Sequence, residues 1–151
     1  MRRMKGFSLI ELLIVVAIIL IIAAIAIPNL VKSKMAANEA AAVGSVRTVV
    51  TSELTYATIF PATGYTSLAN LFSAGMIDSV LGGGNKSGYS YNLGTAGGTP
   101  ATTFTANANP ITVGTTGTNY YCSDQTGVIL RGTSAFSTSS NPCSGGTPIG
   151  Q

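Results

Sequence analysis

The sequence has no histidine and no tryptophan, and only 9% of its 151 residues are charged, against roughly 25% in a typical soluble domain. Without histidine there is no imidazole to bind a metal or act as a general base, and the usual catalytic triads are excluded. The five acidic residues are scattered, so no cluster of nucleophile, base and orienting acid can be assembled. We therefore expect no enzyme, with no catalytic residue, no cofactor and no metal site.

Positive charge is concentrated at the start of the chain, where Arg2, Arg3 and Lys5 account for the whole formal net charge of +3. The rest of the chain carries five basic and five acidic residues and is neutral. Because this part of the chain has no excess positive charge to neutralise phosphates, its charge does not support nucleic-acid binding. The length allows one domain with a hydrophobic core, not two.

Residues 7–31, FSLIELLIVVAIILIIAAIAIPNLV, form a long apolar run in which Glu11 is the one charged residue. As a helix the run spans about 37 Å, more than the roughly 30 Å of a bilayer's hydrocarbon core. The basic residues before it predict a cytoplasmic N-terminus, with the rest of the chain outside the cytoplasm. A secretory signal cleaved near Ala24-Ile25-Ala26 and a simple single-span anchor are the alternatives. Neither explains a carboxylate at the fifth position of the run.

Glu11 is the residue in this run that most needs a chemical explanation. An ionised carboxylate near the end of a membrane helix costs about 2–3 kcal/mol and is usually functional or paired. The run contains no base, but cleavage between Gly6 and Phe7 would create an α-amine four residues before Glu11. That amine could pair with Glu11 of its own chain or of a staggered neighbour. Snorkelling of Glu11 to the lipid headgroups is the alternative.

The segment Lys5-Gly6-Phe7-Ser8-Leu9-Ile10-Glu11 resembles the prepilin cleavage and methylation motif of type IV pilins and related pseudopilins. The resemblance implies that a membrane peptidase cuts after Gly6 and that Phe7 is then N-methylated. It places the family's assembly glutamate on Glu11 and its frequent helix-kinking proline on Pro28.

The same resemblance implies two successive environments for the apolar helix, first a membrane and then a filament core made of its own copies. A helix that is apolar on all sides suits both environments. Because a wrong stagger would leave Glu11 unpaired and buried, we expect this residue to set the register of assembly. The expected division is a removed leader at 1–6, a transmembrane or filament-core helix at 7–31, an amphipathic half of that helix at 32–59 and a head at 60–151.

The fold class predicted for the chain is α+β and type IV pilin-like, with a long N-terminal helix, kinked at Pro28, packed on a small antiparallel sheet. An apolar stripe marks the packing face of the helix at Val43, Val46, Val50, Leu54 and Ala57. Phe60-Pro61 should end the helix, and Ser67 should cap a short helix from Leu68 to Met76. Strand-like runs punctuated by Gly, Pro and Asn follow at 89–93, 102–106, 119–122 and 128–131.

Cys122 and Cys143 are the only cysteines. In an exported chain such a pair is most simply one disulfide, here closing a loop of about twenty residues and contributing on the order of 3 kcal/mol. A C-terminal segment bounded by a disulfide is also common in the pilin family, so the resemblance points the same way.

These observations predict a pilin, the self-polymerising structural subunit of a type IV pilus-like extracellular filament. Its expected partners are the inner membrane before assembly, the prepilin peptidase, the pilus assembly machinery and further copies of itself. One alternative is a pseudopilin of a type II secretion system, although the head lacks the acid-rich calcium loop of that system's major pseudopilin. The other is a membrane-anchored binding module that never polymerises. Adhesion, motility and DNA uptake are not distinguished by the sequence.

Overall fold

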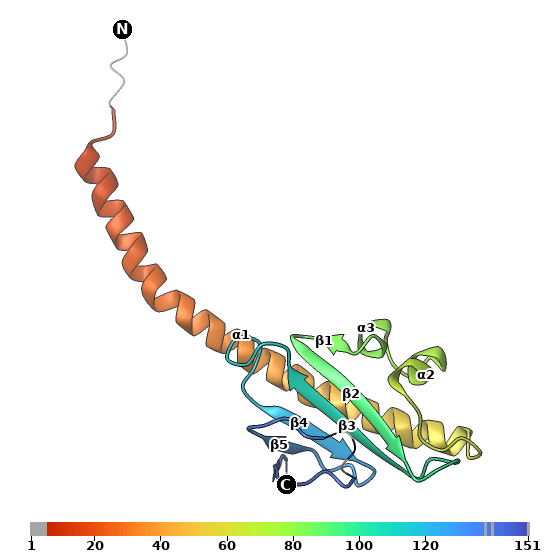
Figure 1. The fold of residues 1–151 in the computed structure, drawn as a ribbon. Coiled ribbons are helices and arrows are strands. Elements are labelled where there is room, and N and C mark those ends of the chain that lie inside the picture. The colour runs from red at the N-terminus through yellow and green to blue at the C-terminus, as the bar shows by residue number, and fades with distance from the viewer. Residues whose placement is uncertain (1–5, 138, 140, 151) are drawn as a thin grey trace. The chain divides into compact units, whose positions relative to one another are not determined.

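The computed structural model describes residues 6–137, 139 and 141–150. The chain divides into two compact units, Met1–Lys34 and Met35–Gln151, here called the N-terminal and C-terminal units. Helix α1 (Leu9–Ile59) supplies residues to both units (Figure 1). It ends directly before Phe60-Pro61, as predicted.

In the N-terminal unit, α1 has no packing partner within the described chain. No described residue from Gly6 to Lys34 is buried, and the large apolar side chains from Phe7 to Val31 are between 39% and 80% exposed. Of the described helices, α1 is the one long and apolar enough to cross a membrane. The helix continues through Pro28 without a break, and a bend at this residue stays a prediction.

The C-terminal unit combines the second half of α1 with a six-stranded antiparallel sheet (Figure 1). The strands are β1 (Asn85–Lys86), β2 (Tyr89–Ala96), β3 (Thr103–Pro110), β4 (Tyr120–Asp124), β5 (Leu130–Gly132) and β6 (Thr147–Pro148). Each strand pairs with the next along the chain, which makes the sheet a simple meander. The longest pairing joins β2 to β3, from Tyr89 opposite Pro110 to Ala96 opposite Thr103. The predicted α+β architecture is confirmed.

The hydrophobic core of this unit contains residues from both α1 and the sheet. The helix contributes Ala42, Val46, Val49 and Val50, and the sheet contributes Tyr89, Tyr91, Phe104, Ala106, Ala108 and Tyr121. The predicted stripe is right at Val46 and Val50 but wrong at Leu54, which is 42% exposed. Glu53 is buried in its place. Glu53 and Leu54 lie three and four residues after Val50, so helical spacing allows either to face the core. The prediction chose Leu54 because it is apolar.

Two short helices precede the sheet. In α2 (Leu68–Ser73), the N-cap is Ser67 as predicted, since its hydroxyl accepts from the Asn70 N–H. The helix ends earlier than predicted, because Gly75 turns the chain with a positive φ of 71°.

Helix α3 (Ser79–Gly82) and the two-residue strands β1 and β6 were not predicted. The Asp78 carboxylate caps α3 by accepting from the N–H groups of Val80 and Leu81. It also accepts from the Lys86 ammonium at 2.7 Å. Asp78 before an apolar pair is a readable N-cap signal, but elements of two to four residues are too short for periodicity to reveal.

Candidate functional site

The Gly6–Phe7 peptide bond lies in exposed, non-helical chain before α1. Phe7 is 80% exposed. A β-carbon added at Gly6 would meet no described atom within 4 Å, so the fold itself does not require glycine there. A requirement for glycine at this position would therefore come from an outside partner. The geometry leaves the bond open to a peptidase.

Glu11 lies in the first turn of α1 and has a hydrogen-bond partner in its own chain. Its Oε2 atom accepts from the Ser8 N–H at 2.9 Å. Ser8 immediately precedes the helix, so this contact is one half of a capping box, and the positive end of the helix dipole favours the carboxylate. The Ser-x-x-Glu spacing was a readable signal that the sequence analysis missed. The other carboxylate oxygen, Oε1, has no hydrogen bond within the described residues.

Beyond Glu11, exposed apolar side chains follow one another along α1, including Leu12, Leu13, Ile14, Val15 and Val16. Because successive helical residues are about 100° apart, consecutive apolar residues cover every side of the helix. A surface this apolar needs cover from outside the chain.

Glu39, which the sequence analysis did not single out as a site residue, joins α1 to the connection between β3 and β4. Its Oε1 atom accepts from the Thr118 N–H at 2.8 Å and from the Asn119 N–H at 3.2 Å. Its Oε2 atom accepts from the Asn119 side-chain amide at 2.9 Å. Desolvation raises the pKa of Glu39, but the hydrogen bonds from Thr118 and Asn119 together hold that pKa below its usual value. The carboxylate therefore fixes the loop to the helix in its charged form.

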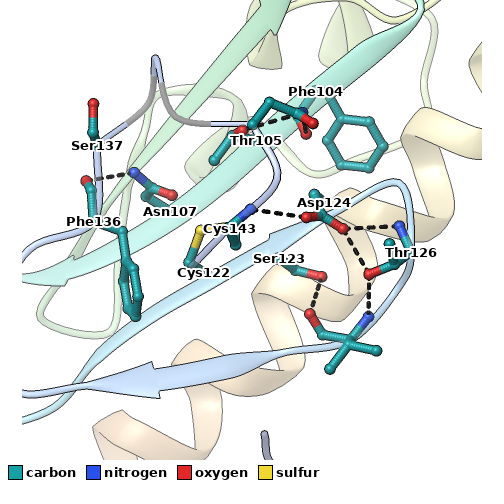
Figure 2. The surroundings of a disulfide bond; sticks show 12 residues. Phe104, Thr105, Asn107, Cys122, Ser123, Asp124, Thr126, Phe136, Ser137 and Cys143 are labelled. Atoms are coloured by element: carbon teal, nitrogen blue, oxygen red, sulfur yellow. Dashed lines mark hydrogen bonds between the residues drawn. A yellow bond between two sulfur atoms is a disulfide. The ribbon is translucent and has the colours of Figure 1, made fainter. Parts of the chain in front are cut away.

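Cys122 and Cys143 form the predicted disulfide, with their Cα atoms 6.1 Å apart. Figure 2 shows Asp124 beside this bond, with its Oδ2 atom accepting from the Cys143 N–H at 2.9 Å. Its Oδ1 atom accepts from the Thr126 N–H, so Asp124 also begins the turn that follows β4. The Asn107 side-chain amide donates to the Phe136 carbonyl at 2.8 Å. The C-terminal segment is thus held covalently and through its backbone.

Glu53 is fully buried in the C-terminal unit. Its Oε2 atom accepts from the Thr66 N–H at 3.0 Å, whereas Oε1 has no hydrogen-bond partner. Burial raises the pKa of Glu53 to about 7, although the Thr66 contact opposes the shift. Within the described residues, no group of three or more His, Cys, Asp or Glu side chains could hold a metal ion.

Comparison with known proteins gives an independent view of the N-terminal segment. Residues 1–27 match the model of the prokaryotic N-terminal methylation motif. The chain is 52% identical over 60 residues to the type IV wide pilus major component of Thermus thermophilus, a match that covers 40% of each protein. Together these findings support membership of the type IV pilin family.

A second type IV pilin, the major pilin protein of Myxococcus xanthus, is 44% identical over 54 residues, covering 36% of this chain and 24% of that protein. The chain thus matches less than half the length of either curated relative. No solved structure matches the chain significantly. The long helix, the antiparallel sheet and the C-terminal disulfide are consistent with a type IV pilin fold.

The structure and the matched motif bring three of the predicted site residues together. Gly6, Phe7 and Glu11 lie within six residues at the start of α1 and inside the matched segment. Pro28 lies just beyond that segment. The roles of these four residues in processing, assembly and bending stay predictions.

Proposed function

We propose that the chain is the structural, non-enzymatic subunit of a type IV pilus-like extracellular filament. The observation that carries the proposal is the apolar part of α1, from Leu9 to Val31, in which no residue is buried by its own chain. A bilayer covers this surface before assembly, and the helices of neighbouring subunits cover it afterwards. The two pilus components that match part of the chain support this role.

Processing starts at the exposed junction before α1. A prepilin peptidase in the inner membrane cuts after Gly6, and the new N-terminal residue, Phe7, is methylated. The match to the N-terminal methylation motif supports this step. Before assembly the chain is anchored in the inner membrane by residues 7–31, and its C-terminal unit lies outside the cytoplasm.

Glu11 sets the stagger of each incoming subunit. Its Oε2 atom holds the start of its own helix through Ser8, and its Oε1 atom is available for a further donor. The α-amine created by cleavage of a neighbouring chain is such a donor. In an apolar filament core an unpaired carboxylate costs several kcal/mol, so wrong staggers are disfavoured. Contacts between the apolar helices hold the subunits together, and the pair formed by the Glu11 carboxylate and the neighbouring α-amine fixes their register.

Mass spectrometry of the N-terminal peptide tests the proposal, with sheared extracellular material compared against the membrane fraction. We expect an N-methylated Phe7 terminus that is abundant in the sheared material. The same terminus confined to the cell envelope would contradict a surface filament and support a pseudopilin. A terminus near Ile27 would show that the apolar run was a signal peptide, and a retained leader on a membrane monomer would indicate a module that does not polymerise.

A further inference from the structure

The two cysteines that form the disulfide lie in unequal surroundings within the C-terminal unit. Cys122 is the middle residue of β4, opposite Asn107 of β3 and Leu130 of β5, and it is 0% exposed. Cys143 lies in a loop outside the described strands and helices and is partly exposed. We therefore expect a reagent from solution to reach the sulfur of Cys143 more easily than that of Cys122.

A cavity of about 180 Å³ lies beside the disulfide. Both cysteines line it, together with the segment from Ser134 to Ser137 and with Ser144 and Gly145, and none of its lining residues is charged. One water molecule needs about 10–15 Å³, so the cavity has room for a side chain of a partner. The rate of thiol–disulfide exchange depends on access to the sulfur that is attacked, and this cavity supplies access on the side of the loop.

Polar contacts hold the loop around Cys143 against the sheet without the help of the disulfide. The Cys143 N–H donates to Oδ2 of Asp124 at 2.9 Å (Figure 2). The Asn141 side-chain amide donates to the Phe104 carbonyl at 2.6 Å, and it exchanges two hydrogen bonds of 3.1 Å with the Gln125 side chain. Because these contacts involve no sulfur atom, we expect them to place the loop beside β4 in the reduced chain as well.

We propose that Cys143 reacts first with a disulfide-bearing oxidant and that Cys122 then closes the bond. In the first step the Cys143 thiolate attacks one sulfur of the oxidant, whose own S–S bond breaks, so that a mixed disulfide forms and one thiolate leaves. In the second step the Cys122 thiolate attacks Sγ of Cys143, and the other half of the oxidant leaves as a thiolate. The two leaving thiolates take up the two protons that the cysteines release. Two protein thiols are thus oxidised to one disulfide, and the disulfide of the oxidant is reduced to two thiols.

Asp124 is a positioning residue for the second step. By holding the backbone N–H of Cys143, its carboxylate keeps the mixed disulfide next to Cys122. Attack within one folded chain then needs no search for a partner, and such prearranged reactions are much faster than encounters in solution. The inference concerns the C-terminal unit alone and does not depend on the proposed filament.

The first test uses the full chain in detergent, reduced beforehand, with glutathione disulfide as the oxidant. The variants Cys122→Ala and Cys143→Ala each keep one thiol, and mass spectrometry follows the addition of glutathione. We expect Cys143 to react at least tenfold faster than Cys122 in the folded chain, and at an equal rate in concentrated urea. A thermal melt verifies that each variant is folded.

The unchanged chain supplies the same comparison with both cysteines present. After reduction and a brief exposure to glutathione disulfide, the reaction is quenched with acid and the adduct is mapped. We expect glutathione on Cys143. Equal reactivity of the two cysteines in the folded chain, or an adduct found mainly on Cys122, would overturn the proposed order.

The second test separates the two steps. Asp124→Ala should not slow the first step, but it should slow closure at least threefold, so that the mixed disulfide accumulates. The matched control is Thr126→Val, which removes a hydroxyl contact to Asp124 in the same turn and leaves the contact to Cys143. Closure of the Asp124→Ala chain as fast as that of the Thr126→Val chain would overturn the positioning role.

Discussion

The two parts of α1 bury apolar side chains in different ways. From Leu9 to Val31 the helix is apolar on every side, and nothing in its own chain covers it. From Ala42 to Glu53 it is apolar on one face, and the core of the C-terminal unit covers that face. An amphipathic stripe therefore indicates cover by the same domain, whereas uninterrupted apolarity indicates cover by something outside the chain.

The three glutamates of α1 extend this comparison. Glu11 holds the start of the helix and keeps one oxygen available, Glu39 fixes a loop with both of its oxygens, and Glu53 is buried with a single partner. These different environments predict different effects when each glutamate is replaced. Removing Glu11 should affect contacts between chains, whereas removing Glu39 or Glu53 should affect the folding of one chain.

The largest expected effect comes from Glu11→Ala. Membrane insertion and cleavage should continue, because the apolar run and the junction are intact, but assembled filament should fall at least tenfold. Immunoblots of sheared and membrane fractions measure both quantities. The matched control is Ile10→Ala, which shortens a neighbouring exposed side chain and leaves the carboxylate. Normal filaments from Glu11→Ala would contradict the pairing of this carboxylate.

Gly6→Ala should leave the leader attached. The fold has room for a β-carbon at this position, so the change tests recognition by the peptidase without disturbing the helix. Gel electrophoresis should show a subunit heavier by the leader, and circular dichroism of the purified chain should be unchanged. Complete processing of Gly6→Ala would show that glycine is not what the peptidase requires.

Removing the disulfide should destabilise the C-terminal unit and leave the N-terminal part of α1 as it is. Replacing both Cys122 and Cys143 by Ser opens a link between residues 21 apart in sequence, which should lower the free energy of unfolding by about 3 kcal/mol. Urea titration of the full chain in detergent, followed by tyrosine fluorescence, measures the loss. Membrane insertion serves as the control and should not change. An unaltered urea midpoint would mean that the backbone contacts of Asp124 and Asn107 hold the segment by themselves.

The smallest effect concerns the pH dependence of stability. The folded-state pKa of Glu53 is raised to about 7, so the folded protein holds a proton that the unfolded chain releases above its own pKa of about 4.3. Stability should therefore fall as pH rises from about 4.5 to 7, by at most about 3 kcal/mol. Urea titrations across this range should show a decline that Glu53→Gln removes.

Glu39→Gln is the matched control for that series. The pKa of Glu39 is lowered in the folded protein, so its stabilising effect is present above the unfolded pKa and is lost as pH falls through the folded one. The two substitutions should change the pH profile in opposite senses. Parallel profiles for Glu53→Gln and the unchanged chain would show that Glu53 does not carry the pH dependence.

Local patterns in the sequence predicted much of the architecture. The apolar run, the Ser67 cap and the strands β2 to β5 depend on neighbouring residues, and each was found near its predicted place. The Cys122–Cys143 disulfide joins residues 21 apart, and it was predictable because the chain has only two cysteines. Contacts across the fold were not predictable in this way. The partners of Glu39 lie about 80 residues away, and nothing near Glu39 in sequence indicates them. Leu54 was wrongly placed in the core because hydrophobicity alone favours it over Glu53, whose burial depends on the loop at Thr66.

The most direct test of the account asks what covers the exposed apolar part of α1 at each stage. A photo-crosslinking amino acid in place of Ile18, which is 53% exposed, reports the neighbours of that position. In the membrane fraction we predict crosslinks to lipid, and in sheared filaments we predict crosslinks to residues 9–31 of a second copy. Crosslinks only to lipid in both fractions, or crosslinks from position 18 to the C-terminal unit of the same chain, would contradict the account.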